Sequence, residues 1–270
     1  MAAPGTEGHD GRDEPLEDAL ARLYDVDLVE DPGDLDLYLA LAARAEGPVL
    51  ELAAGTGRLA IPLAAAGHRV TAVDLDPAML ARLRRRAATA GSTVERRIDV
   101  AEADLLELDL PSAGSFGLAF IALNSLFLLA TREAQRQAFR TIASHLAPGG
   151  IAAVDVWLPD ADDLARFDGR MILEYVRDDA ETGGQVTKVA AAQHDASSGI
   201  VNLTSIFEEG RAGEATIRWI RRDVLRLVSA DELSDFATQA GLDVETVAGD
   251  YDLGPLGSGG DRAILVARKP

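Results

Sequence analysis

The sequence contains no cysteine, which excludes disulfide bonds and thiolate chemistry. It also has no apolar run long enough to cross a membrane, and its polar start lacks the basic region and apolar core of a signal peptide. Lysine occurs only at Lys188 and Lys269, whereas arginine and alanine are abundant, as in proteins of GC-rich bacteria. We therefore expect a bacterial, cytoplasmic protein without a membrane partner.

Basic charge is scarce as well. The chain carries 45 acidic residues against 26 lysines and arginines, a net charge of −19. Binding of nucleic acid requires basic patches that face phosphates, so no nucleic-acid partner is expected. Twelve acidic residues and two arginines fall within residues 1–36. We predict that residues 1–15 form a disordered, solvated acidic tail.

One stretch carries most of the functional information. Residues 51–58 read E-L-A-A-G-T-G-R, after the apolar residues 48–50 and before a helical pattern over 59–66. This order predicts a strand, a glycine turn and a helix, in which the backbone bends sharply and helix N–H groups face a ligand. The next predicted strand ends in Asp74, 17 residues after Gly57, about the spacing expected for a ribose-binding carboxylate.

The acid that precedes the glycines helps to choose the ligand. Residues 55–60 fit the dinucleotide-binding pattern only loosely, and that pattern alone is a weak signal. Glu51, which we expect inside the turn, would repel a pyrophosphate and attract a cationic amino or sulfonium group. The residues therefore favour a cationic cofactor over a dinucleotide.

Five motifs together resemble those of the class I S-adenosylmethionine-dependent methyltransferases. In the family's order they are E-L-A-A-G-T-G-R (51–58), V-D-L-D-P-A-M-L (73–80), E-A-D-L-L (102–106), A-L-N-S-L-F (122–127) and L-A-P-G-G (146–150). The similarity covers about residues 20–160, and residues 261–268 look like the family's last strand. The resemblance implies S-adenosyl-L-methionine as cofactor and S-adenosyl-L-homocysteine as product. Ala53 departs from the family, which usually has glycine there.

The resemblance also implies a set of site residues. The turn would hold the methionine part of the cofactor, the acid after the second strand its ribose, and the residues that follow its adenine. Asp104 and the Leu105 backbone would recognise the adenine amino group. The cofactor-binding residues so implied are Tyr24, Glu51, Ala53, Gly55, Thr56, Gly57, Arg58, Asp74, Leu75, Met79, Asp104, Leu105 and Leu123. Asn124 and Tyr24, expected beside the methyl group, are the catalytic candidates.

The rest of the chain shows how the domain is organised. Alternating strand and helix patterns predict a doubly wound, mostly parallel, seven-stranded α/β sheet over residues 16–157 and 229–270, with a helical cap at 16–47. Residues 158–228 break the alternation and contain four strand-like runs separated by glycine-rich turns. We predict an inserted antiparallel β-subdomain that serves as a lid or as a subunit contact, for example in a homodimer.

The acceptor is less well determined. The stretch after the asparagine motif, residues 127–129, is apolar and lacks the histidine found in some relatives, and each of the four histidines has a structural explanation. A hydroxyl acceptor needs a general base, whereas an amine needs only to arrive neutral, so N-methylation of a small molecule is favoured over O-methylation. No cluster has metal-ligand spacing, so no metal is expected. An NAD-dependent oxidoreductase and a non-catalytic S-adenosylmethionine-binding protein are the alternatives.

Overall fold

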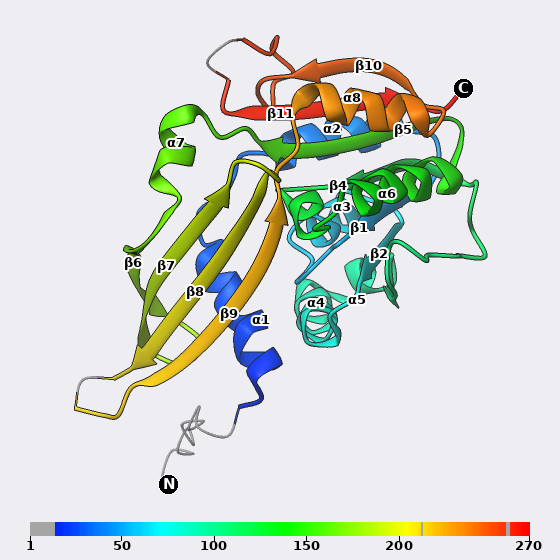
Figure 1. The fold of residues 1–270 in the computed structure, drawn as a ribbon. Coiled ribbons are helices and arrows are strands. Elements are labelled where there is room, and N and C mark those ends of the chain that lie inside the picture. The colour runs from blue at the N-terminus through cyan, green and yellow to red at the C-terminus, as the bar shows by residue number, and fades with distance from the viewer. Residues whose placement is uncertain (1–13, 212, 258–259) are drawn as a thin grey trace, which may run out of the picture.

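The computed structural model describes residues 14–211, 213–257 and 260–270, which form two β-sheets and the helices around them (Figure 1). The larger sheet has seven strands in the order β10-β11-β5-β4-β1-β2-β3. Its strands are β1 (Val49–Leu52), β2 (Val70–Asp74), β3 (Ile98–Glu102), β4 (Phe116–Ile121), β5 (Leu146–Trp157), β10 (Asp243–Ala248) and β11 (Arg262–Arg268). β1 to β5 pair in parallel, and only β11 runs in the opposite direction, because it pairs antiparallel with both β5 and β10. The predicted fold class is confirmed.

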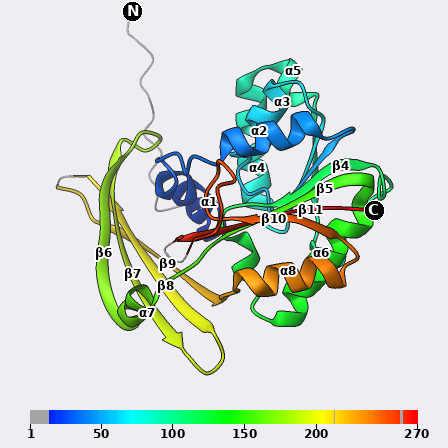
Figure 2. The same ribbon diagram turned by 90° about the horizontal axis from the view of Figure 1, so that it is seen from above.

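Both faces of this sheet are buried, as the nearly continuous apolar strands require. Along β1, Val49 belongs to the core on one face and Leu50 to the core on the other. Figure 2 shows helices on both sides of the sheet. One face packs on α2 (Leu35–Arg44), α3 (Ala60–Ala65) and α4 (Pro77–Ala90), and the other on α6 (Arg132–His145) and α8 (Ala230–Gln239). The carboxyl ends of the parallel strands therefore form one edge at which a ligand can bind.

Local capping signals were reliable. Asp76 accepts hydrogen bonds from the backbone of Ala78 and Met79, with Pro77 at the first helical position, so the Asp-Pro pair of the sequence marks the start of α4. A capping box of Ser229 and Glu232, which the spacing of the two residues signals, opens α8. The short helix α5 (Ser92–Glu95) precedes β3, so this strand begins only at Ile98. Gly91, with a φ of 112°, makes the turn between α4 and α5.

The second sheet is antiparallel and lies between β5 and α8 in the chain, as predicted. It has four strands in sequential order, β6 (Asp168–Asp179), β7 (Gly184–Asp195), β8 (Ile200–Gly210) and β9 (Ile217–Arg226). The sequence did not predict α7 (Ala161–Arg166) or the 3₁₀ turn η2 (Ser125–Leu128). Both are short, and only the capping box of Asp160 and Asp163 marks α7.

Helix α1 (Leu16–Asp27) lies between the antiparallel sheet and the main body (Figures 1 and 2). On one side Leu23 packs against Val186 and Phe207 of the antiparallel sheet. On the other side Ala21 packs against Met79 of α4. Most of the predicted acidic tail, residues 1–13, lies outside the described residues. Residue 14 is bound, not solvated, because Glu14 accepts hydrogen bonds from Arg22.

Candidate active site

The glycine turn after β1 has the backbone conformation that its sequence demands. Ala53, Gly55 and Gly57 have positive φ values of 57°, 54° and 82°. A Cβ on Gly57 would lie 2.7 Å from Cγ of Leu83, so this glycine is required for packing as well as for its conformation. Ala53 adopts a left-handed conformation that costs an ordinary residue about 1–2 kcal/mol. Its methyl group is accommodated, but at the cost of backbone strain that glycine would avoid.

Glu51 lies in β1 and not inside the turn as expected. Its side chain is directed into the interior, the residue is 4% exposed, and Oε2 has no hydrogen-bond partner among the described residues. Burial raises the pKa of Glu51 to about 8, against the opposing effect of the Arg58 guanidinium, while Asp34 and Asp74 raise it further. A buried carboxyl with a free acceptor atom fits an ammonium group of a ligand.

Arg58 is held by an ion pair with the helical cap. Its guanidinium forms two hydrogen bonds of 2.6 Å with Asp34, which precedes α2. Asp34 is fully buried, so this ion pair fixes the end of the glycine turn against the helical cap. Its positive charge still acts on the pKa of Glu51.

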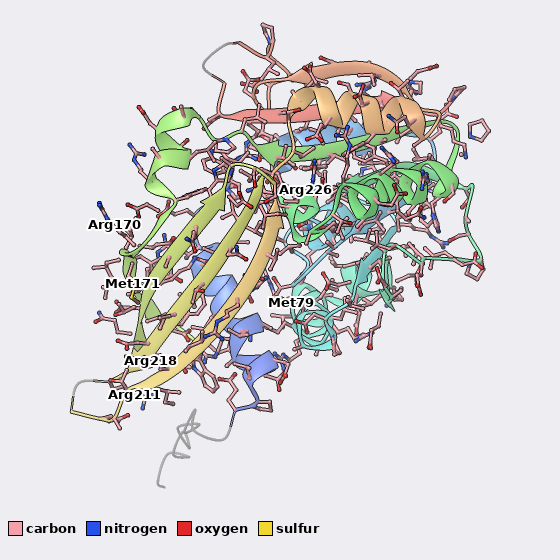
Figure 3. The ribbon with its side chains drawn as sticks, in the orientation of Figure 1. Met79, Arg170, Met171, Arg211, Arg218 and Arg226 are labelled. Carbon is pink, nitrogen blue, oxygen red and sulfur yellow. The ribbon has the colours of Figure 1, made fainter. Side chains whose placement is uncertain are left out.

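Asp74 ties the first two strand ends together. Oδ2 accepts a hydrogen bond of 2.7 Å from the backbone of Gly55, and Oδ1 accepts one of 2.9 Å from Asp76. Burial raises the pKa of Asp74, although these two backbone bonds oppose the effect. Beyond it, Leu75 is 66% exposed, whereas Met79 is buried on α4 next to α1 (Figure 3).

The residues after β3 lie at the same edge of the sheet. Asp104 is exposed, and its carboxylate accepts a hydrogen bond from the backbone of Leu106. The Leu105 carbonyl accepts one of 2.9 Å from the Thr141 hydroxyl of α6. This loop is therefore anchored while the side chain of Asp104 faces solvent.

Two successive residues with left-handed conformations follow β4. Leu123 and Asn124 have φ values of 49° and 66°. The Asn124 side-chain oxygen accepts a hydrogen bond of 2.5 Å from the backbone of Trp157, at the end of β5. Its oxygen is thus committed to structure, which leaves the amide NH₂ as the group with which Asn124 can contact a ligand.

Asp155 of β5, which the sequence did not single out, holds this turn in place. It is fully buried and accepts hydrogen bonds from the backbone of Leu123 and from the hydroxyls of Tyr38 and Tyr251. Arg262 of β11 forms an ion pair with it at 3.0 Å. Burial raises the pKa of Asp155, and the bond from Tyr38 opposes the effect. The sequence signal that could have pointed to Asp155 is an aspartate within an otherwise apolar strand, V-D-V-W.

Tyr24 of α1 lies over the glycine turn. A Cβ on Gly55 would be 3.7 Å from its ring. Burial raises the pKa of Tyr24 to about 12, with an opposing effect from Arg58, so its hydroxyl stays protonated near neutral pH. Asp25, the next residue, accepts a hydrogen bond of 2.6 Å from the Thr56 hydroxyl and pairs with Arg82 of α4.

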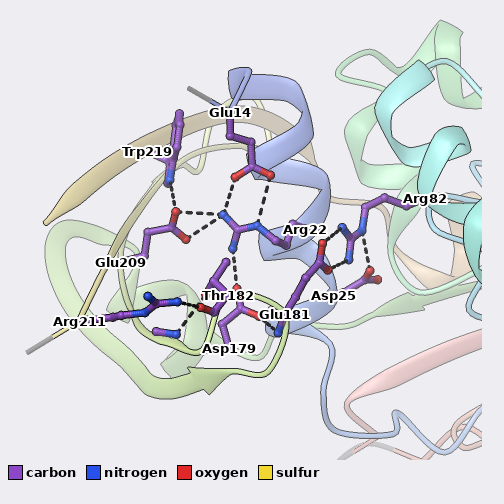
Figure 4. Close-up of polar contacts among 11 residues, drawn as sticks. Glu14, Arg22, Asp25, Arg82, Asp179, Glu181, Thr182, Glu209, Arg211 and Trp219 are labelled. Atoms are coloured by element: carbon purple, nitrogen blue, oxygen red, sulfur yellow. Dashed lines mark hydrogen bonds and ion pairs between the residues drawn. The ribbon is translucent and has the colours of Figure 1, made fainter. Parts of the chain in front are cut away.

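A charged cluster around Arg22 fixes α1 to the antiparallel sheet (Figure 4). Arg22 is 2% exposed and pairs with Glu14, Asp179 and Glu209 at 2.7, 2.6 and 3.0 Å. Arg82 extends the cluster to Glu181, in the turn between β6 and β7. Because breaking a buried ion pair typically costs about 3–5 kcal/mol, α1 is firmly held between the two parts of the chain.

A cavity of about 620 Å³ opens beside this helix. Tyr24, Leu123 and Asn124 line it at one side, and the inner face of the antiparallel sheet lines the other. Its wall is mainly apolar, and its charged residues are Asp27, Asp163, Arg166, Glu174, Lys188, Arg221 and Asp223. No histidine occurs among the described residues that line it. Arg221 lines the cavity, whereas its neighbour Arg222 is exposed, as the alternation of a strand requires.

The likeness to known proteins identifies the chain. A family model described as a methyltransferase domain matches residues 49–150. The cypemycin N-terminal methyltransferase of Streptomyces sp. is 30% identical over 207 residues, which cover 75% of this chain and 75% of that protein. The chain belongs to the class I S-adenosylmethionine-dependent methyltransferase family. Its cofactor is S-adenosylmethionine, and the NAD-dependent alternative is set aside.

Solved structures agree with the methyltransferase fold. The CcbJ methyltransferase of Streptomyces caelestis is 25% identical, with a TM-score of 0.74 over 90% of this chain and 98% of that chain. The sugar N-methyltransferase KedS8 of Streptoalloteichus sp. is 20% identical and shares the fold, with a TM-score of 0.67 over 100% and 98% of the two chains. Within the described part of this methyltransferase, no helix is long and apolar enough to span a membrane.

Proposed function

We propose that this methyltransferase transfers a methyl group to an amine nitrogen of a small molecule, which binds in the cavity between α1 and the antiparallel sheet. The observation that carries the proposal is the composition of that cavity. Four carboxylates and three basic side chains line it, without a histidine among the described lining residues. A carboxylate excess favours an amine, and a wall without histidine lacks the usual base for a hydroxyl.

The cofactor would lie along the edge formed by the first three strands. When bound, S-adenosylmethionine supplies a methyl group on a positively charged sulfur. Glu51 would accept the ammonium group of the methionine part, because its Oε2 is buried and free of partners among the described residues. Asp74 would accept the ribose hydroxyls through the remaining lone pairs of its carboxylate. Leu75, Met79 and Asp104 would surround the adenine.

The residues that line the acceptor cavity would promote methyl transfer mainly by positioning the acceptor. Tyr24 and the amide group of Asn124 line the cavity at its cofactor end, where they can orient the acceptor nitrogen. Orientation alone supplies up to about 7–11 kcal/mol in well-fixed reactions. The antiparallel sheet would serve as the lid of the acceptor site, since its inner face forms the far wall of the cavity. That the protein forms a homodimer stays a prediction.

Product analysis tests this proposal directly. The protein is incubated with S-adenosylmethionine and a panel of primary amines, amino sugars, peptides and phenols, and methylated products are located by mass spectrometry. N-methylated products without phenol methylation are expected. Methylation confined to hydroxyl acceptors would overturn the preference for nitrogen.

A further inference from the structure

Lys188 occupies an unusual place in this chain. It is one of only two lysines, it lies on β7, and it is 9% exposed at the wall of the acceptor cavity. Its ammonium group lies 2.7 Å from Asp27 of α1 and 2.8 Å from Glu174 of β6. The ring of Phe207 lies 5.7 Å from the same nitrogen. Helix α1 and the β6–β7 hairpin thus place two carboxylates and one cation at one point of the wall.

The charges elsewhere on the wall are balanced in pairs. Arg221 pairs with Asp223 at 2.9 Å, and Arg166 pairs with Asp163 at 3.3 Å. The cluster of Asp27, Glu174 and Lys188 therefore holds the one carboxylate in excess. Side chains of Asp27 and Glu174 are 32% and 40% exposed, so both carboxylates have room for a further donor. An anionic ligand group would have to compete with both of them for Lys188.

This cluster is close to the cofactor end of the cavity. Tyr24 and Asp27 are three residues apart on α1, which places them on the same side of the helix and about 4.5 Å apart along its axis. A compact molecule can therefore contact both. The wall between and around them is apolar, with Leu20, Phe207 and Leu225 among its residues.

We propose that Asp27 and Glu174, of whose two charges Lys188 neutralises only one, recognise a second ammonium group on the acceptor, so that the substrate is a compact diamine with an apolar body. One amine would face Tyr24 and Asn124 for methylation. The other would lie against the carboxylate oxygens of Asp27 and Glu174 that Lys188 leaves free. This inference rests on the proposed N-methyltransferase function and specifies its substrate class.

Matched ligands test the recognition of the second amine. The protein saturated with S-adenosylhomocysteine is titrated by NMR with p-xylylenediamine, p-methylbenzylamine and p-(aminomethyl)benzoate, which differ only in the group opposite the amine. We expect the diamine to bind about tenfold more tightly than the monoamine, the gain from one charge-assisted hydrogen bond. The benzoate should bind most weakly.

Variants locate the effect. Asp27→Asn and Glu174→Gln should each remove most of the preference for the diamine and leave S-adenosylhomocysteine binding unchanged. Asp178→Asn is the matched control, because it makes the same charge change on the same strand at an exposed residue outside the cavity wall. It should keep the preference.

Several outcomes would overturn the inference. They are equal binding of diamine and monoamine, tighter binding of the benzoate through Lys188, no binding of the diamine up to its solubility limit, or a preference that survives both cavity variants. Methyl transfer is measured separately on the same compounds. A diamine preference without methylation of any amine would refute the proposed N-methyltransferase function but support recognition of a second amine by Asp27 and Glu174. Methylation of all amines without a diamine preference would support the proposed function but refute this recognition.

Discussion

The buried carboxyl of Glu51 makes protein stability depend on pH in a direction opposite to that of an ordinary salt-bridged acid. Burial raises its pKa from 4.5 to about 8. The folded protein therefore keeps a proton that the unfolded chain releases at lower pH. Its contribution to the free energy of unfolding is fully present below pH 4.5 and is lost as the pH rises through about 8. At 1.36 kcal/mol per pH unit, the loss is about 5 kcal/mol.

The variant Glu51→Gln isolates this effect. Glutamine has nearly the same shape and no charge, so the variant should not lose this stability between about pH 5 and pH 9. Urea unfolding of both proteins at several pH values provides the measurement. The free energy of unfolding of the parent protein should fall relative to the variant as the pH rises. Parallel pH profiles would refute the reasoning, because they would show that Glu51 titrates as an ordinary exposed glutamate.

The same carboxyl should couple cofactor binding to proton release. An ammonium group binds the ionised form, so the affinity for S-adenosylhomocysteine should rise about tenfold per pH unit up to about pH 8. Calorimetry in buffers of different ionisation enthalpy counts the protons released. Binding to Glu51→Gln should be weaker above pH 8, with no proton release from this site. Equal proton release by the two proteins would place the titrating group elsewhere.

Three further substitutions have defined outcomes. Asp155→Ala removes the shared partner of Tyr38, Tyr251 and Arg262 and should lower the free energy of unfolding by about 3–5 kcal/mol in urea titrations. Arg82→Ala removes two ion pairs that hold α1 and the β6–β7 turn to α4, so S-adenosylhomocysteine should dissociate about three- to tenfold faster in stopped-flow experiments. Asp74→Ala deletes the acceptor of the Gly55 N–H and the predicted ribose ligand, so calorimetry should show affinity for the same ligand about 100-fold lower.

Matched controls separate these effects from general damage. Asp235→Ala on α8 removes an exposed carboxylate and should change stability by less than about 0.5 kcal/mol. Arg84→Ala changes an exposed arginine on the same helix as Arg82 and should leave dissociation rates unchanged. Dissociation from Arg82→Ala at the parental rate would show that the contacts of α4 do not limit cofactor release. Undiminished affinity of Asp74→Ala would remove Asp74 from the cofactor site.

Local sequence patterns determined the fold class and the cofactor. Hydrophobic periodicity and capping signals depend on a few neighbouring residues. The chain alone therefore indicates the start of α4 at Asp76, the start of α8 at Ser229 and the four-stranded insertion. The glycine turn was equally local, since positive φ values at Gly55 and Gly57 are conditions on single residues. Motifs in order along the chain then indicated S-adenosylmethionine.

Contacts across the fold decided what the sequence could not. Asp155 meets Tyr38 across 117 residues, Arg22 meets Asp179 across 157, and Lys188 meets Asp27 across 161. No periodicity or spacing in the sequence predicts such pairs, because strand order and helix packing determine which residues come into contact. For the same reason the sequence placed Glu51 in the turn, whereas it lies in β1, where burial within the fold raises its pKa. The acceptor cavity exists only because the inserted sheet folds back over α1.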